Sequence, residues 1–456
     1  MRCAAALLLC LCAGAATNAA ADDDDAALAA EAVTYLLQHT ERSLSLHPFG
    51  HYPTRTQPLP APDSSNGTLL LWETGGPSGW TSGFWPGLFW QLYRATGPSS
   101  SGPGSASERN HDSASPGHGS GSNNNKWLSR ALDWTEALRA QQFRNSSHDV
   151  GFIIGSSFGK GLALGALGDN ASAIADWRSV VSQAAESLAS RFDPRVGCTM
   201  SWNPGAHCKL HPEWRTNYTV IIDNMMNLEL LFLAAQPQPT APEPKRTAAQ
   251  QRLYDVATSH ANKTAANHVR ADGTTYHVVD YDAETGAVRH RCAAAGYADN
   301  STWARGQAWA LYGFTMSYRF TRDPAYLATA TATADAFVEA VGARFDDAVP
   351  FFDFDVPGNA TAGANAALRD ASAAAIAASG LLELARHASP ASPRRAALYG
   401  AFARRMLRSL VRGGYRSDFA AQEGAVAHCD GGNLDVSWAD YYLAEACARL
   451  VNASAL

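Results

Sequence analysis

The chain has 456 residues, of which 46% are hydrophobic, so it is long enough to bury a large core. Its formal net charge of −6 argues against a nucleic-acid-binding protein, which would need a basic surface. No stretch beyond the N-terminus is long and apolar enough to predict a membrane anchor.

The N-terminus predicts a secretory signal peptide. Arg2 gives a positive start, and residues 4–16 form an apolar stretch that is too short to span a bilayer. Small residues follow, so we expect cleavage near Ala21. Residues 1–21 would then be a signal peptide, and 22–456 the mature protein. A buried N-terminal helix is the alternative.

Asn-x-Ser/Thr sequons support the same interpretation. Eight of them occur, at Asn66, Asn145, Asn170, Asn217, Asn262, Asn300, Asn359 and Asn452. Together with a signal peptide they predict a glycosylated, secreted, extracellular protein.

Apolar residues recur at helical spacing in twelve segments after the signal. The predicted helices are 26–46, 82–96, 126–142, 157–167, 170–191, 219–235, 248–268, 303–320, 324–342, 368–387, 394–411 and 436–451. The alternating run Tyr276–Tyr281 predicts a strand in a small hairpin. Residues 98–125 are almost entirely polar and predict a disordered, low-complexity insertion within one domain.

Twelve helices can form six helical hairpins. We therefore predict an all-α fold, an (α/α)6 barrel with minor β-hairpin elements in loops. The helix predicted over 219–235 is apolar nearly all round, which indicates a buried position in the inner ring. A solenoid of helix pairs is the alternative, but no fixed-period repeat is visible.

Five cysteines remain after removal of the signal peptide. Cys198 and Cys208 flank a short loop and are the predicted disulfide pair. No Cys-x-x-Cys or His-Glu-x-x-His spacing is present, so we predict neither a metal site nor a cofactor.

Asp223 is the first candidate catalytic residue. It lies in an apolar helical segment, where an unpaired charged carboxylate would cost several kcal/mol. Burial raises the pKa of a carboxyl group, which suits a general acid. A helix cap or a buried salt bridge would also explain this residue.

Asp149 is the second candidate. It precedes a glycine-rich stretch, on a segment between two predicted helices. A turn aspartate before glycine is the alternative, and from spacing alone it is the better one.

Aromatic residues cluster in three places, around Trp85, around Trp309 and near Trp438. Sugars stack on aromatic rings, and the planar guanidinium of Arg305 could bind a carboxylate. Arg305 and Trp309 share one helix face and predict a pocket for an anionic sugar. Core packing between helices would account for at least half of these aromatic residues.

Five motifs in order resemble the unsaturated glucuronyl hydrolases of glycoside hydrolase family 88. They are GFWPG at 83–87, HDVGF at 148–152, IIDNMMNLELL at 221–231, WARGQAW at 303–309 and WADYYLAEA at 438–446. The resemblance implies an (α/α)6 barrel. It also implies release of a 4,5-unsaturated uronic acid from lyase-generated oligosaccharides, by hydration of the C4=C5 double bond.

The resemblance also implies roles for individual residues. Asp223 corresponds to the general acid/base, and Asp149 to the carboxylate that holds the uronate ring. Further pocket positions correspond to His148, Trp85, His277, Arg305 and Trp309. The implied partner is an oligosaccharide ending in an unsaturated uronic acid.

Two positions depart from the family pattern. Ala295 stands where members carry glutamine before Gly-Tyr, so a polar contact to the substrate would be missing. The segment 429–437 has no cation, whereas members that prefer sulfated fragments place serine and lysine there. We therefore expect a weak preference for sulfated substrates.

Two other functions compete with this one. An unsaturated rhamnogalacturonyl hydrolase of family 105 would share the barrel and the chemistry. A non-catalytic carbohydrate-binding barrel would keep stacking aromatic residues without needing Asp149 and Asp223.

Overall fold

The computed structural model describes residues 2–59, 69–97, 120–237, 245–357, 369–390, 392–430 and 434–452, with the side chains of these ranges except 2–22 and 120–123. Its α-helices are α1 (Arg2–Leu46), α2 (Phe84–Thr96), α3 (Ser120–Glu136), α4 (Lys160–Ala163), α5 (Ala171–Ala189), α6 (Asn224–Ala234), α7 (Ala248–Asn267), α8 (Ala304–Thr321), α9 (Pro324–Gly342), α10 (Ala371–Ala388), α11 (Pro393–Arg412) and α12 (Ser437–Val451). A 3₁₀ helix, η1, spans Arg139–Phe143, and a π-helix, η2, spans Gly151–Gly159. The prediction of a mainly helical fold is confirmed.

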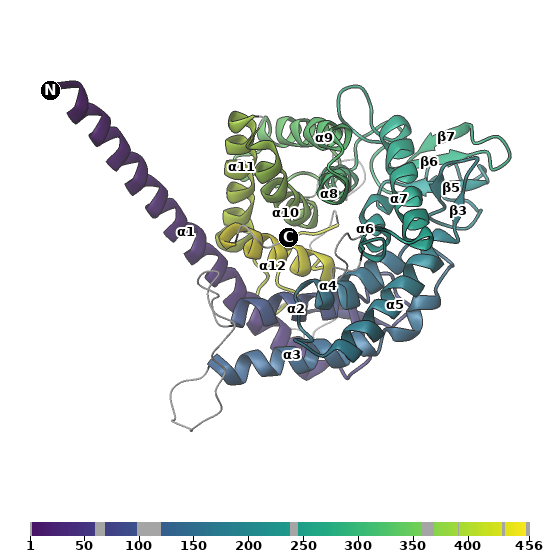
Figure 1. The fold of residues 1–456 in the computed structure, drawn as a ribbon, viewed down its shortest axis with the longest axis horizontal. Coiled ribbons are helices and arrows are strands. Elements are labelled where there is room, and N and C mark those ends of the chain that lie inside the picture. The colour runs from purple at the N-terminus through teal and green to yellow at the C-terminus, as the bar shows by residue number, and fades with distance from the viewer. Residues whose placement is uncertain are drawn as a thin grey trace.

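The helices form two concentric rings. In Figure 1, α2, α4, α6, α8, α10 and α12 surround the centre, and α3, α5, α7, α9 and α11 lie outside them. Consecutive helices pack as inner–outer pairs, such as α8 with α9 and α10 with α11. The last inner helix, α12, packs against the first inner helix, α2, and thereby closes the ring; it also packs against α1. This closure distinguishes a barrel from the solenoid alternative.

Burial separates the two rings. On the inner helix α8, every residue from Ala304 to Ser317 is buried. On the outer helix α11, buried residues such as Tyr399, Phe402 and Met406 recur at helical spacing and the remainder faces outward. The apolar patterns therefore assign helices to the correct ring.

The strands form three small sheets. They are β1 (Tyr52–Leu59) with β2 (Leu69–Gly75), β3 (Phe192–Asp193) with β4 (Cys198–Thr199), and β5 (Tyr218–Ile221), β6 (Val278–Tyr281) and β7 (Val288–Cys292) in that order. All pairs are antiparallel. Strand β6 confirms the strand predicted over Tyr276–Tyr281 and forms the expected hairpin with β7.

Three predicted helices differ from the structure. The helix predicted over 126–142 ends at Glu136, in α3, and is followed by the 3₁₀ helix η1. The segment 219–235 divides into strand β5 and helix α6, because its first residues are β-branched and pair with β6. The helix predicted over 157–167 begins earlier, as η2 at Gly151, and ends at Ala163. Gly151 is required there, since a Cβ atom would lie 2.6 Å from the Cα atom of Asn227 on α6.

The predicted disulfide is wrong. Cys208 bonds to Cys292, while Cys198 is a buried free thiol. Cys198 packs with Val220 and Val279, whereas the Cys208–Cys292 pair packs with Ile221 and Val278. Neighbouring strand residues face opposite sides of a sheet, so the sheet separates Cys198 from Cys208. Closeness in sequence could not reveal this separation.

Two further predictions concern the polar insertion and the signal peptide. Residues 98–119 of the predicted insertion lie outside the described residues, and 120–125 belong to α3 rather than to a disordered segment. The predicted signal peptide, residues 1–21, lies almost entirely on α1, whose N-terminal part extends away from the barrel in Figure 1. Within the described part of the chain, no helix has the length and apolar character needed to cross a membrane.

Candidate active site

One end of the barrel collects most of the predicted site residues. The inner helices alternate with outer ones along the chain, so their N-termini gather at the same end. Asp223 is the N-cap residue of α6, and Asp149 lies two residues before η2. Arg305 lies in the first turn of α8. Helix N-termini carry partial positive charge, which favours anionic groups at this end.

Ser201 connects the two segments that carry the candidate carboxylates. Its carbonyl accepts a hydrogen bond from the backbone N–H of His148 (3.1 Å). Its hydroxyl accepts from the backbone N–H of Ile221 (3.0 Å) and from the side chain of Asn224 (3.2 Å). These bonds join His148–Asp149 to the start of α6, an arrangement that sequence spacing does not show.

Asp223 lies in a largely desolvated position. Burial raises the pKa of its carboxyl group to about 6, against the opposing influence of His148 and Arg305. Its Oδ1 atom has no hydrogen-bond partner among the described groups and lies 3.6 Å from Nε2 of His277. Asp223 makes no side-chain capping hydrogen bond, so a helix cap does not explain its position.

Asp149 has charged and polar neighbours instead. Its Oδ2 accepts a hydrogen bond from Ser147 (2.6 Å), and its Oδ1 lies 3.3 Å from Nε2 of His148. Burial alone would raise the pKa of Asp149. The influence of His148, Ser147 and Arg144 outweighs burial and lowers it below the ordinary value. Asp149 is therefore a carboxylate at neutral pH.

His277 is oriented by the backbone at the position where the family pattern is broken. The backbone of Ala295 contacts Nδ1 of His277 through its N–H (2.9 Å) and its carbonyl (3.2 Å), while Nε2 faces Oδ1 of Asp223 at 3.6 Å. Burial lowers the pKa of His277 to about 3, which keeps the ring neutral. Alanine at 295 leaves this backbone contact intact.

Arg305 lies in a more crowded environment than its motif suggests. Its guanidinium contacts Asp370 (3.3 Å) and Asp430 (2.7 Å). The rings of Trp303 and Trp438 lie 4.5 and 5.2 Å from it. Burial would lower the pKa of Arg305, but the two carboxylates outweigh burial and raise it.

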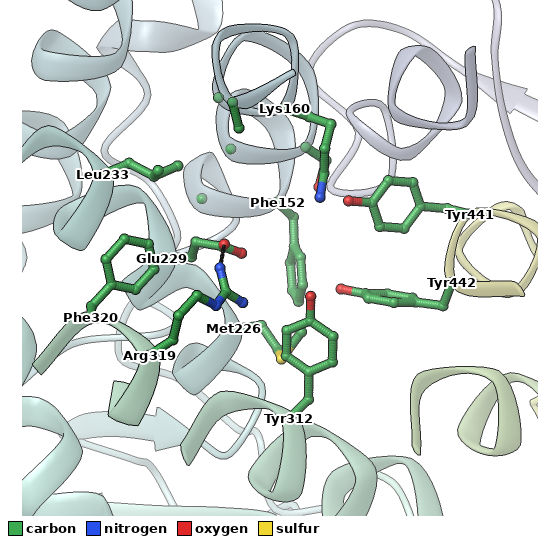
Figure 2. A pocket seen from close by; sticks show the side chains of 15 residues that line it. Phe152, Lys160, Met226, Glu229, Leu233, Tyr312, Arg319, Phe320, Tyr441 and Tyr442 are labelled. Atoms are coloured by element: carbon green, nitrogen blue, oxygen red, sulfur yellow. Dashed lines mark hydrogen bonds and ion pairs between the residues drawn. The ribbon is translucent and has the colours of Figure 1, made fainter. Parts of the chain in front are cut away.

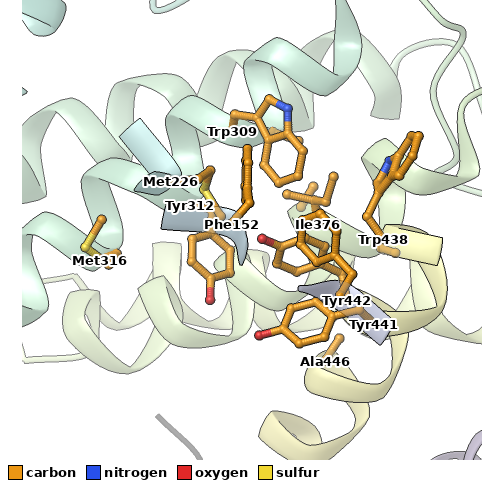
Figure 3. Close-up of a cluster of buried hydrophobic side chains, with 14 of the residues drawn as sticks. Phe152, Met226, Trp309, Tyr312, Met316, Ile376, Trp438, Tyr441, Tyr442 and Ala446 are labelled. Atoms are coloured by element: carbon orange, nitrogen blue, oxygen red, sulfur yellow. The ribbon is translucent and has the colours of Figure 1, made fainter. Parts of the chain in front are cut away.

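The structure places two predicted residues away from any open surface. Trp309 is fully buried and packs against Phe152 and Tyr442, within the aromatic cluster of Figure 3. Trp85 is also buried and packs against Phe89. Both rings contribute to core packing, the alternative considered from sequence. Trp303 and Trp438 are buried to a similar extent, so burial alone does not place Trp85 and Trp309 outside the site.

Sequence reasoning missed the aromatic residues that do surround Arg305. Trp303 contacts both Arg305 and His277, and Trp438 lies beside the partly exposed Trp80, with ring centres 4.8 Å apart. Trp80, Trp303 and Trp438 all belong to the aromatic clusters that are visible in the sequence. Clustering alone does not distinguish the ring of each cluster that faces the site.

Several buried polar atoms at this end have no hydrogen-bond partner in the described part of the protein. They are Oδ1 of Asp223, Nδ1 of His148 and the indole nitrogens of Trp303, Trp309 and Trp438. Most buried polar groups in proteins are paired, so these atoms can pair with the groups of a bound polar ligand. Among the described residues, no group of His, Cys, Asp and Glu side chains has the arrangement of a metal site.

A cavity of about 200 Å³ lies elsewhere in the barrel. Its lining includes Phe152, Lys160, Glu229 and Arg319, and Figure 2 shows the ion pair of Arg319 with Glu229 beside it. Neither Asp149 nor Asp223 lines this cavity. It is therefore distinct from the candidate active site.

Comparison with known proteins identifies the family, although no family model matches the chain. An unsaturated glucuronyl hydrolase of Bacillus sp. strain GL1 is 31% identical over 387 residues, which cover 81% of this chain and 86% of the relative. The chain belongs to the unsaturated glucuronyl hydrolase family. It is therefore a glycosidase, and the rhamnogalacturonyl and non-catalytic alternatives are not favoured.

Other members of the unsaturated glucuronyl hydrolase family agree. The enzyme of Formosa agariphila is 35% identical over 305 residues, 67% of this chain and 62% of that longer relative. A solved unsaturated glucuronyl hydrolase described as specific for heparin is 28% identical, with a TM-score of 0.71 and coverage of 93% of this chain and 96% of that one. The (α/α)6 barrel is thereby confirmed.

Proposed function

We propose that the protein removes a 4,5-unsaturated uronic acid from the non-reducing end of lyase-generated oligosaccharides. One observation carries the proposal: a desolvated Asp223, with a pKa of about 6, lies at the same barrel end as the ionised Asp149 and the cationic Arg305. A proton donor, an acceptor for sugar hydroxyls and a cation for a uronate are the groups that this reaction requires.

The ring alkene of the substrate is a vinyl ether. Asp223 donates its proton to C4, and positive charge develops at C5 and on the ring oxygen. The resulting Asp223 carboxylate then accepts a proton from the water that adds at C5. The product is a hemiketal, which opens and releases the remaining sugar. Asp149 stays ionised and accepts hydrogen bonds from the ring hydroxyls.

Replacement of the proton donor tests this mechanism. Asp223→Asn should lower kcat by at least ~10², the scale of a lost general acid, with an unchanged fold. Loss of the ultraviolet absorbance of the unsaturated uronate measures turnover, and circular dichroism checks folding. Asp346→Asn, in an exposed turn, makes the same change outside the site and should be neutral. Near-wild-type turnover by Asp223→Asn would reject the mechanism.

The class of substrate requires a separate assay. One related structure is described as a glycosaminoglycan-degrading enzyme of Bacillus sp. strain GL1, and it covers 94% of this chain at 26% identity. We infer that unsaturated glycosaminoglycan disaccharides are consumed faster than unsaturated pectin disaccharides. The segment 429–437 contains Asp430 and Asp435 and no cation, which favours unsulfated disaccharides. Faster turnover of a sulfated chondroitin disaccharide would contradict this preference.

We also propose that the protein is secreted and glycosylated. Five of the six sequon asparagines in the described ranges are exposed: Asn145, Asn170, Asn217, Asn262 and Asn300. Asn66 and Asn359 lie outside the described residues. Expression in a eukaryotic secretory host should give a protein in the medium that starts near Asp22 and loses mass on treatment with an N-glycanase. Retention in the cell with an intact N-terminus would contradict the proposal.

A further inference from the structure

The side chain of Arg305 is 8% exposed, and the two carboxylates that contact it differ in their access to solvent. Trp303 and Trp438 lie against the Arg305 guanidinium, and the fully buried Asp370 occupies its Nη1 side at 3.3 Å. The Nη2 side contacts Asp430, whose side chain is 28% exposed. Because Asp430 is the only one of the two carboxylates with solvent access, an external anion must approach Arg305 from the Asp430 side.

Asp430 therefore occupies the position that a substrate carboxylate would need. Its Oδ1 lies 2.7 Å from Nη2 of Arg305, which is the distance of a strong, charge-assisted hydrogen bond. A uronate carries the same chemical group on its ring. Two carboxylates cannot share one guanidinium edge without repulsion, so binding of one excludes the other.

We propose that Asp430 is an internal competitor of the substrate's uronate for Arg305 and thereby sets the affinity of the site for anionic sugars. The proposal rests on the proposed function, in which the ligand ends in a uronate. On binding, the Asp430 side chain rotates towards solvent and the sugar carboxylate takes its place. Asp430 is thus a specificity-determining residue rather than a catalytic one.

Backbone hydrogen bonds hold the chain before Asp430. The N–H of Ala371 donates to the carbonyl of His428 (3.0 Å), and the N–H of Cys429 donates to the carbonyl of Leu434 (2.9 Å). Asp430 itself has a φ of +54°, a left-handed conformation that Asp and Asn tolerate better than most residues. Asp430→Asn therefore removes the charge while keeping the backbone conformation.

The test compares the free acid of an unsaturated disaccharide with its uncharged methyl ester. We expect Asp430→Asn to lower KM for the free acid about three- to tenfold, the scale of one weakened ion pair. KM for the ester should change less than about twofold, because the ester carries no charge to compete for Arg305. Asp430→Ser should give the same pattern if the first variant folds poorly, and the exposed Asp346→Asn should change neither KM.

Two results would overturn the proposal. An unchanged or higher KM for the free acid would show that Asp430 positions Arg305 instead of competing for it. An equal decrease in KM for the free acid and for the ester would show a steric effect of the Asp430 side chain. Calorimetric titration of the Asp223→Asn protein with the free-acid disaccharide gives a second decision that does not need turnover, because adding Asp430→Asn to that variant must lower Kd. Wild-type protein that binds the disaccharide without consuming it would reject the proposed function alone.

Discussion

Asp223 and Asp149 belong to neighbouring segments but have pKa values shifted in opposite directions. Asp223 faces the neutral ring of His277 and lacks a hydrogen-bond donor at Oδ1, so burial dominates and its pKa rises to about 6. Asp149 has Ser147 and His148 beside its oxygens, and its pKa falls. Opposite shifts in two carboxyl groups are a recurring way to separate an acid from an ionised partner.

These shifts give a pH dependence with a definite sign. The reaction begins with a protonated Asp223, and the pKa of about 6 means that this form is lost as the pH rises through 6. Asp149 remains ionised down to below 3.8. We therefore expect kcat/KM to be highest at mildly acidic pH and to decline above about pH 6. A pH–rate profile measures this, and a rise in kcat/KM between pH 6 and 8 would contradict it.

The sequence could identify these two carboxylates but not their neighbours. Asp223 could be identified because a carboxylate in an apolar segment is unfavourable unless it has a partner or a function. Asp149 could be identified because its motif matches the family pattern. Asp370 and Asp430 contact Arg305 from positions 65 and 125 residues later in the chain. Such contacts depend on how the inner helices come together, which local spacing does not contain.

Among the elements, periodicity predicted long helices better than short segments. Helix α9 has the predicted bounds, 324–342, and begins with Pro324 after the N-cap Asp323. The segment that carries Asp223 was predicted as one helix, because β-branched apolar residues also suit a buried helix. Pairing with β6 decides that Tyr218–Ile221 is a strand, and this partner lies some sixty residues later.

The first turn of α12 holds the segment that leads to Asp430. The carboxyl group of Asp440 accepts hydrogen bonds from the backbone N–H groups of Ala425 (3.1 Å) and Val426 (3.0 Å). Burial raises the pKa of Asp440 to about 8, and the nearby Asp435 reaches about 7. Both carboxyl groups are thus neutral in the folded protein over a wider pH range than in the unfolded chain.

A raised carboxyl pKa stabilises the fold at low pH. The contribution of Asp440 is complete below its ordinary pKa of 3.8 and is lost as the pH rises towards 8. Asp440→Asn copies the neutral form and can keep both backbone bonds. We expect it to raise Tm at pH 8 by about 2 °C or more while changing Tm little at pH 4. Thermal unfolding at the two pH values measures this, with Asp346→Asn as the control. Equal shifts at both pH values would contradict it.

At the scale of the whole molecule, the two ends of the barrel carry different kinds of charge. The end with the inner-helix N-termini contains the candidate active site, where Asp149, Asp223, Asp370 and Asp430 outnumber the arginines that contact them, Arg144 and Arg305. The other half of the inner ring contains a balanced ion network of Lys160, Glu229, Arg319, Glu383, Glu445 and Arg449. The sequence shows these residues as isolated charges in apolar helices, since their pairing exists only after the ring closes.

Glu383 is the central acceptor of this network. It is fully buried and contacts Arg319 (2.8 Å) and Arg449 (3.1 Å). Glu383→Gln keeps the shape but leaves two buried cations with less negative charge, which should lower the free energy of unfolding by about 3–5 kcal/mol. The matched control, Glu73→Gln, affects an exposed pair with Arg55 and should cost less than about 1 kcal/mol. Urea unfolding measures both. A loss below about 1 kcal/mol for Glu383→Gln would contradict this expectation. It would mean that Glu229 and Glu445 supply enough negative charge to balance both arginines without Glu383.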